Sequence, residues 1–105
     1  SDFGNIFTNN STIIKFMQEY DKIIQKAIGQ VLYKVRKSKK LKFTIFCYEN
    51  DIPKTTLYMI EKGKNKAYAT SLCKIISALG LSFEEFGALL DKELPENFTN
   101  ENNLE

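Results

Sequence analysis

Hydrophobic residues recur at steps of three and four along most of the chain, which is the spacing of an amphipathic helix. The first such stretch runs from Ser11 to about Ser38. Gly29 lies inside it and costs about 1 kcal/mol relative to Ala, so the stretch is compatible with one long helix or with two helices broken before Asp21. Its apolar positions are Ile13, Ile14, Met17, Tyr20, Ile24, Ile28, Val31 and Val35.

Two short helices joined by a tight turn are expected after a basic connector at residues 38–42. The first helix is expected over residues 43–49, the turn over residues 50–52 and the second helix over residues 53–62. Pro53 is tolerated at this start because the first helical turn leaves its N–H groups without intrahelical partners. The core-facing positions of the two helices are Phe46, Cys47, Leu57 and Ile60.

Glycine residues mark the ends of the next two helices. Gly63 stands where the second short helix must stop, because glycine accepts the left-handed conformation of a C-terminal cap. A further helix is then expected over residues 69–79 and is closed by Gly80. The residues expected on its core face are Leu72, Ile75, Ile76 and Leu79.

The two ends of the chain differ in pattern from its middle. Residues 1–10 mix large apolar residues with Asn and Gly, and we expect a docking arm there. The last helix begins at a capping box formed by Ser82 and Glu85 and ends before Pro95. The Asn-rich, acidic residues 95–105 have few apolar positions and are expected to be unstructured.

These elements predict an all-α protein with one core. A chain of 105 residues is long enough for a single domain. We expect an N-terminal extension at residues 1–22, which is a possible dimerisation segment, a five-helix domain within residues 23–94 and a tail at residues 95–105.

The charge of the chain is unevenly distributed. Residues 21–80 carry 13 Lys and Arg against four acidic residues, a net charge of +9, whereas the remainder carries −7. A basic segment attracts polyanions, and contact with phosphates releases counterions, so nucleic acid is a candidate partner. The same charge is compatible with a solvated lysine-rich surface.

The residues available for chemistry are few. His is absent, and the two cysteines, Cys47 and Cys73, are 26 positions apart in apolar helical contexts, so we expect two buried, reduced thiols and no metal or other cofactor. No apolar run approaches the roughly 20 residues that span a bilayer, and the N-terminus lacks the pattern of a signal peptide. A cytoplasmic protein without membrane contact is expected.

The stretch FTIFCYENDIPKTTLYMIEKGKNK has the layout of a helix-turn-helix, whose second helix enters the DNA major groove. Together with IGQVLYKVRKSKKLK and SLCKIISALGLSFEEF, it resembles the phage-repressor helix-turn-helix family, also called XRE or Cro-like, without gaps from Ile28 to Phe86. The features that carry the resemblance are Val35 with Arg36, Glu61 two residues before Gly63, and the run Ala78, Leu79 and Gly80.

The resemblance implies roles for individual residues. Lys54, Thr55 and Met59 occupy the positions that contact bases, although Met59 could instead pack partly against the core. Arg36 and Glu61 correspond to an internal ion pair that ties the first helix to the recognition helix. The residues expected at the groove rim or on phosphates are Lys42, Thr56, Tyr58, Lys64, Asn65 and Lys66, with Lys39 and Lys40 adding to the same field.

The sequence departs from the family pattern in three places. The first short helix usually opens with a polar cap and a Gln that binds a phosphate, whereas this chain has Lys42 and Phe43 there. Cys47 replaces the usual Ala, and Asp51 replaces the usual turn glycine and must adopt left-handed geometry. Phosphate anchoring must therefore shift, and Lys42 is the nearest candidate.

The leading functional interpretation is a sequence-specific DNA-binding regulator, expected to be a repressor, that binds double-stranded DNA as a homodimer on a palindromic operator. Half-sites about one helical turn apart are expected. The alternative is a protein-interaction module with the same fold, such as an antitoxin or anti-repressor. We do not expect an enzyme, because the chain has no His, no Gly-rich phosphate loop and no activated cysteine.

Overall fold

The computed structural model describes residues 2–96 and 98, with side chains described from residue 12 onward. Within these residues the chain is all-α, with five helices and no strand. None of the described helices has both the length and the hydropathy needed to cross a bilayer. The helices are α1 (Asp2–Ser38), α2 (Phe43–Glu49), α3 (Lys54–Glu61), α4 (Ala69–Ala78) and α5 (Phe83–Glu93).

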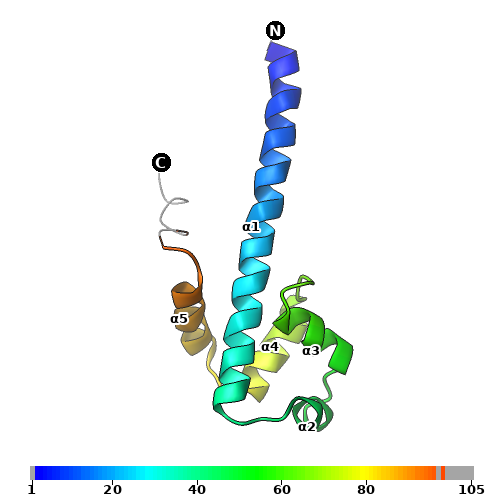
Figure 1. The fold of residues 1–105 in the computed structure, drawn as a ribbon, viewed down its shortest axis with the longest axis vertical. Helices are drawn as coiled ribbons and strands as arrows, with labels where there is room; N and C mark the ends of the chain where they lie inside the picture. Colours follow the sequence, from blue (N-terminus) through cyan, green and yellow to red (C-terminus); the bar gives the residue numbers. More distant parts are fainter. Residues whose placement is uncertain (1, 97, 99–105) are drawn as a thin grey trace.

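The first helix is a single unbroken rod that projects from the rest of the molecule (Figure 1). The segment at residues 1–10, expected to be a docking arm, is helical from Asp2 onward and continues into α1. In the sequence, Phe3, Ile6 and Phe7 continue the steps of three and four found from Ile13 onward, and the intervening Asn residues had obscured this continuity. The choice between one helix and two is settled in favour of one.

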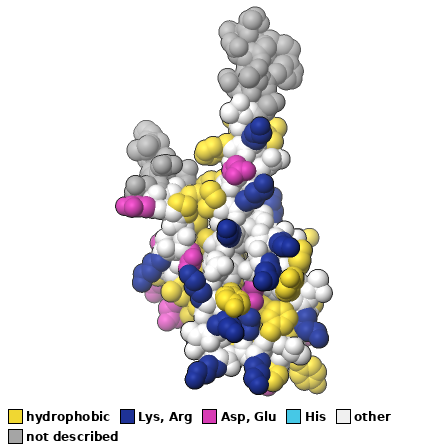
Figure 2. Space-filling model, in the orientation of Figure 1, with side chains coloured by type: hydrophobic (Ala, Val, Ile, Leu, Met, Phe, Trp, Pro, Cys, Tyr) yellow, Lys and Arg dark blue, Asp and Glu magenta, His cyan; other side chains and the backbone are white. Residues whose placement is uncertain are grey.

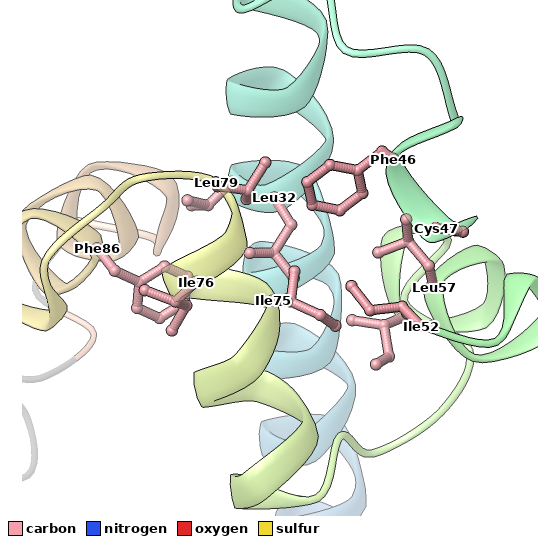
Figure 3. Packing of buried hydrophobic residues seen from close by; sticks show 11 residues of the cluster. Leu32, Phe46, Cys47, Ile52, Leu57, Ile75, Ile76, Leu79 and Phe86 are labelled. Carbon is pink, nitrogen blue, oxygen red and sulfur yellow. The ribbon is translucent and has the colours of Figure 1, made fainter. Parts of the chain in front are cut away.

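The C-terminal half of α1 packs with α2–α5 to form a unit that we call the head, residues 23–94. Figure 1 places α5 on one side of α1 and α3 on the other. Figure 3 shows Leu32 of α1 between Leu79 on one side and Phe46 of α2 on the other. Leu32, Leu57 and Ile75 are almost completely shielded from solvent, so one apolar core joins all five helices.

Gly29 sets how closely α1 and α3 approach. A Cβ atom at this position would lie 2.4 Å from the carbonyl oxygen of Ile60 and 2.7 Å from that of Glu61. These distances are too short for any real side chain, so glycine is required by the close contact between the two helices. This contact explains why the long helix tolerates a poor helix former in its interior.

The ends of the helices lie close to the positions predicted from the sequence. Gly63 and Gly80 have φ angles of 70° and 78°, as expected for glycines after a helix. The helix predicted over residues 53–62 is one residue shorter at each end, with Pro53 as its N-cap and Lys62 as its C-cap. The capping box of Ser82 and Glu85 is confirmed, and these hydrogen bonds lower the pKa of Glu85.

The two cysteines have different environments. Cys47 is buried in the core as expected, and burial raises the pKa of its thiol. The expected burial of Cys73 is wrong, because its side chain is exposed. The inward face of α4 is formed by Ile75 and Ile76, and a residue two positions before Ile75 lies about 200° away around the helix.

The C-terminal segment after α5 returns toward α1. Phe98 stacks on Tyr20 with ring centroids 4.7 Å apart, and its amide donates to the carbonyl of Pro95 at 3.0 Å. The unstructured tail expected over residues 95–105 otherwise falls outside the described residues.

Candidate nucleic-acid interface

A tight turn joins α2 to α3 and fixes the direction of α3 relative to α2. Asp51 adopts the left-handed conformation, with φ of 54°, and the amide of Ile52 donates to the carbonyl of Cys47 at 2.9 Å. The side chain of Asn50 donates to the carbonyl of Phe46 at 2.9 Å. Asp51 therefore takes the conformation that glycine would adopt most easily, stabilised by hydrogen bonds on both sides of it.

Lys74 of α4 holds the same turn from outside. Its ammonium donates to the carbonyl of Asp51 at 2.7 Å and lies 3.8 Å from the carboxylate of that residue. Sequence analysis did not identify this role, because the two residues are 23 positions apart and no local pattern pairs them.

The first turn of α3 presents polar side chains to solvent. Lys54 and Thr55 are exposed, whereas Thr56 is half-buried on the side that faces the loop after Gly63. Met59 is half-buried one turn further along, and Leu57 is completely buried. A ligand that approaches the N-terminus of α3 can therefore reach the side chains of Lys54 and Thr55.

A second set of cations follows the C-terminal end of α3. The ammonium of Lys62 lies 5.7 Å from the centre of the Tyr58 ring, which is half-exposed. Lys64, Asn65 and Lys66 are all exposed on the loop. Lys66 pairs with Asp21 of α1 at 3.0 Å, so its charge is partly balanced, whereas Lys64 has no ion-pair partner among the described residues.

An ion pair between α1 and α3 lies behind this surface. Arg36 donates to the Glu61 carboxylate at 2.7 Å from Nε and at 3.1 Å from a terminal nitrogen, and its other terminal nitrogen donates to the carbonyl of Leu41 at 2.8 Å. Both side chains are more than nine-tenths buried. The hydrogen bond to Glu61 raises the pKa of Arg36, which keeps the guanidinium charged.

Phe43 covers this ion pair. Its ring centre lies 5.2 Å from the guanidinium carbon of Arg36, and the ring of Tyr33 lies 5.7 Å from the same atom. Aromatic faces attract guanidinium groups at such distances. Phe43 therefore has a structural contact at the position where the resembling family carries a phosphate-binding Gln.

A shallow basic hollow of about 570 Å³ opens beside Phe43, at the corner between α1 and α2. Lys42, the residue expected to take over phosphate anchoring, is exposed at this hollow. The lining residues are Tyr33, Arg36, Lys37, Lys40, Leu41, Lys42 and Phe43. Lys39 is directed elsewhere, because its ammonium donates to the carbonyl of Leu79 at 2.5 Å and caps α4.

Charges of opposite sign occupy different parts of the head. Figure 2 shows Lys and Arg side chains over its lower part and acidic side chains gathered at the left, over α5. In α5 the acidic residues are Glu84, Glu85, Asp91 and Glu93. Lys34 of α1 pairs with Glu93, which places part of the basic charge against α5. The cations around α2, α3 and the following loop form a separate surface, in which Glu49 and Asp51 are exposed acidic side chains.

We define the α3 surface as Lys42, Lys54, Thr55, Tyr58, Lys62 and Lys64. Polyanion binding is the chemistry that it supports, because its charged side chains are exposed cations. Within the described part of the chain, no group of three His, Cys, Asp or Glu side chains is arranged to hold a metal ion. No protein family model, curated protein or solved structure matches this chain.

Proposed function

We propose that this protein is a DNA-binding regulator of transcription that inserts the N-terminal turn of α3 into the major groove. The observation that carries the proposal is the α3 surface: an exposed helix start bearing Lys54 and Thr55, together with the exposed Lys42 before α2 and Lys64 after α3. An α-helix fits the major groove, and residues at its N-terminus reach base edges there. The regulator acts in the cytoplasm, where the DNA is.

In this proposal the side chains of α3 have separate roles. Lys54 donates to guanine O6 and N7, and Thr55 donates to a base or contacts a thymine methyl group. Met59 is half-buried, so it offers one exposed edge for apolar contact. Thr56 and Tyr58 lie at the rim of the groove.

Lysines outside α3 supply affinity without sequence preference. Lys42 precedes α2 and Lys64 follows the C-terminal end of α3, and both are exposed, so in this proposal each contacts a phosphate. Asn65 and Lys66 add neutral and charged donors on the same loop. The buried pair of Arg36 and Glu61 keeps α3 in position for these contacts.

Selection of bound duplexes from a library of random DNA sequences tests the proposal. We expect a recurring short sequence to be enriched over successive rounds. No enrichment over the unselected library would overturn the proposal and would favour the alternative, a protein-interaction module such as an antitoxin or anti-repressor.

A matched set of variants keeps this test specific to the α3 surface. The double variant Lys54→Ala and Thr55→Ala removes two exposed side chains and should lose the enriched sequence while remaining folded. Lys92→Ala, which removes an exposed lysine from α5, should return the same sequence as the unmodified protein.

A further inference from the structure

The N-terminal half of α1 extends well beyond the head (Figure 1). The helix meets the rest of the molecule at Tyr20, which stacks on Phe98, and at Asp21, which pairs with Lys66. Side chains 12–19 are all exposed. At 1.5 Å per residue, residues 2–19 form a helical arm about 27 Å long.

One side of this arm is strongly apolar. Ile13, Ile14, Phe16 and Met17 are 52%, 57%, 67% and 58% exposed. At 100° per residue they fall within one half of the helix circumference, whereas Lys15 and Glu19 fall in the other half. The sequence before residue 12 places Ile6 and Phe7 at the same spacing. We call the apolar side of residues 13–17 the arm stripe.

The arm is a poor helix by itself. Its first ten helical residues include Gly4 and three Asn residues, all weak helix formers. Helices of this length in water gain most of their stability from packing an apolar face against a partner. The unbroken helix at Asp2–Ser38 therefore requires something to cover the arm stripe.

We propose that a second copy of this chain covers the arm stripe, with the two arms packed antiparallel. The stripe carries no charge, so two identical stripes meet without repulsion, and a two-fold pair buries the same residues on both copies. Residues 99–105 include one large apolar residue, Leu104, so this segment offers little apolar surface to cover the stripe.

The position of the head decides between parallel and antiparallel packing. Around the helix, the arm stripe lies on the same side as Ala27 and Val31, which are buried in the head. In a parallel pair, the stripes would face each other and both heads would occupy the same space. In an antiparallel pair, each arm lies along the free part of the other and ends near the partner's head.

The head also sets the overlap of the two arms. Tyr20 and Asp21 already contact other parts of the chain, so the overlap ends before them, spans residues 2–19 and has its two-fold axis near residue 11. Roughly half of these residues lie on the apolar side of the arm, so each copy contributes about ten residues to the interface, fewer than the roughly 20–30 a side of a standard stable interface.

One consequence rests on the proposed DNA-binding function. In Figure 1, α3 and α5 flank α1 on opposite sides. The two-fold rotation that relates the paired arms therefore keeps the α3 helices of both copies on the same side of the pair. The end of α3 lies level with Gly29, about 18 residues from the two-fold axis, so the two copies of α3 are at least about 50 Å apart along the paired arms. One turn of DNA spans about 34–36 Å, so the half-sites should be more than one turn apart, which departs from the one-turn spacing expected from the sequence.

Sedimentation equilibrium of the full chain without DNA tests the pairing, and its outcome is independent of the DNA proposal. The unmodified protein should be dimeric at micromolar concentrations. Met17→Glu places a charge on the arm stripe and should weaken dimerisation by about tenfold or more. Gln18→Glu places the same charge on the neighbouring exposed residue away from the stripe and should leave the dimer intact. A monomeric unmodified protein, or equal effects of both variants, would overturn the proposal.

Disulfide crosslinking tests the orientation. In a Cys73→Ser background, which removes the exposed thiol, Ile13→Cys lies near the two-fold axis and should crosslink two copies. Ile24→Cys lies far from the axis and should not. Crosslinking at both positions would contradict antiparallel packing, because a parallel pair brings identical residues together along the whole helix.

Discussion

Arg36 and Glu61 join α1, the longest helix, to α3, the candidate recognition helix, through two hydrogen bonds of 2.7 and 3.1 Å. Arg36 lies near the end of α1, and Glu61 is the last residue of α3. Each side chain is more than nine-tenths buried, so neither charge can be solvated if its partner is lost. The pair thus makes the position of α3 depend on α1.

Glu61→Gln should destabilise the protein by about 3 kcal/mol, because it leaves the buried guanidinium of Arg36 without a counter-charge. Urea unfolding followed by circular dichroism measures the loss. Glu49→Gln changes an exposed carboxylate in α2 and should alter the free energy of unfolding by less than about 0.5 kcal/mol. Similar losses in the two variants would show that the buried pair does not hold α3 in place.

Two Gly→Ala variants test the close contact of α1 and α3. Alanine is favoured over glycine inside a helix by about 1 kcal/mol. Gly87→Ala in α5 should raise the free energy of unfolding by this amount, because a Cβ atom there meets no atom within 4 Å. Gly29→Ala should instead lower the melting temperature, because its Cβ would lie 2.4 Å from the backbone oxygen of Ile60. A stabilised Gly29→Ala protein would mean that α1 and α3 separate easily.

Local patterns in the sequence predict most of the head. The steps of three and four, the glycines at 63 and 80 and the capping box of Ser82 and Glu85 are interactions between near neighbours, so sequence spacing reveals them. The resemblance also pointed to the pair of Arg36 and Glu61, which are 25 positions apart and which the structure brings together.

The remaining features depend on contacts between distant residues. Phe43 was an unexplained departure in the sequence, and its role emerges only when α2 places the ring against Arg36. Lys74 and Lys39 bind backbone oxygens on other elements, which no periodicity reveals. The helical start of α1 was missed because its residues have weak helix propensity, so local preference argued against the continuous helix that the structure contains.

Lys54 and Lys64 are a matched pair for separating base reading from phosphate contact, since both are exposed lysines. Lys54→Ala should reduce discrimination between the selected duplex and random duplex by about 1–3 kcal/mol. Thr55→Ala should act in the same direction. Lys64→Ala should weaken binding to both duplexes by the same factor. The ratio of its affinities for the selected and the random duplex should therefore equal that of the unmodified protein.

Competition binding with the two duplexes measures these ratios. Equal losses on every sequence from Lys54→Ala and Thr55→Ala would remove both residues from the base-reading role. A change of sequence preference in Lys64→Ala would place base contact in the loop rather than at the start of α3.

The affinity for a random-sequence duplex, measured by fluorescence anisotropy at 50 and 200 mM salt, tests the DNA-binding claim most directly. Four exposed lysines of the α3 surface (Lys42, Lys54, Lys62 and Lys64) could each neutralise one phosphate. Counterion release then predicts an affinity that falls by about 100-fold between the two salt concentrations. Negligible binding at 50 mM, or binding that does not change with salt, would contradict DNA recognition through this surface.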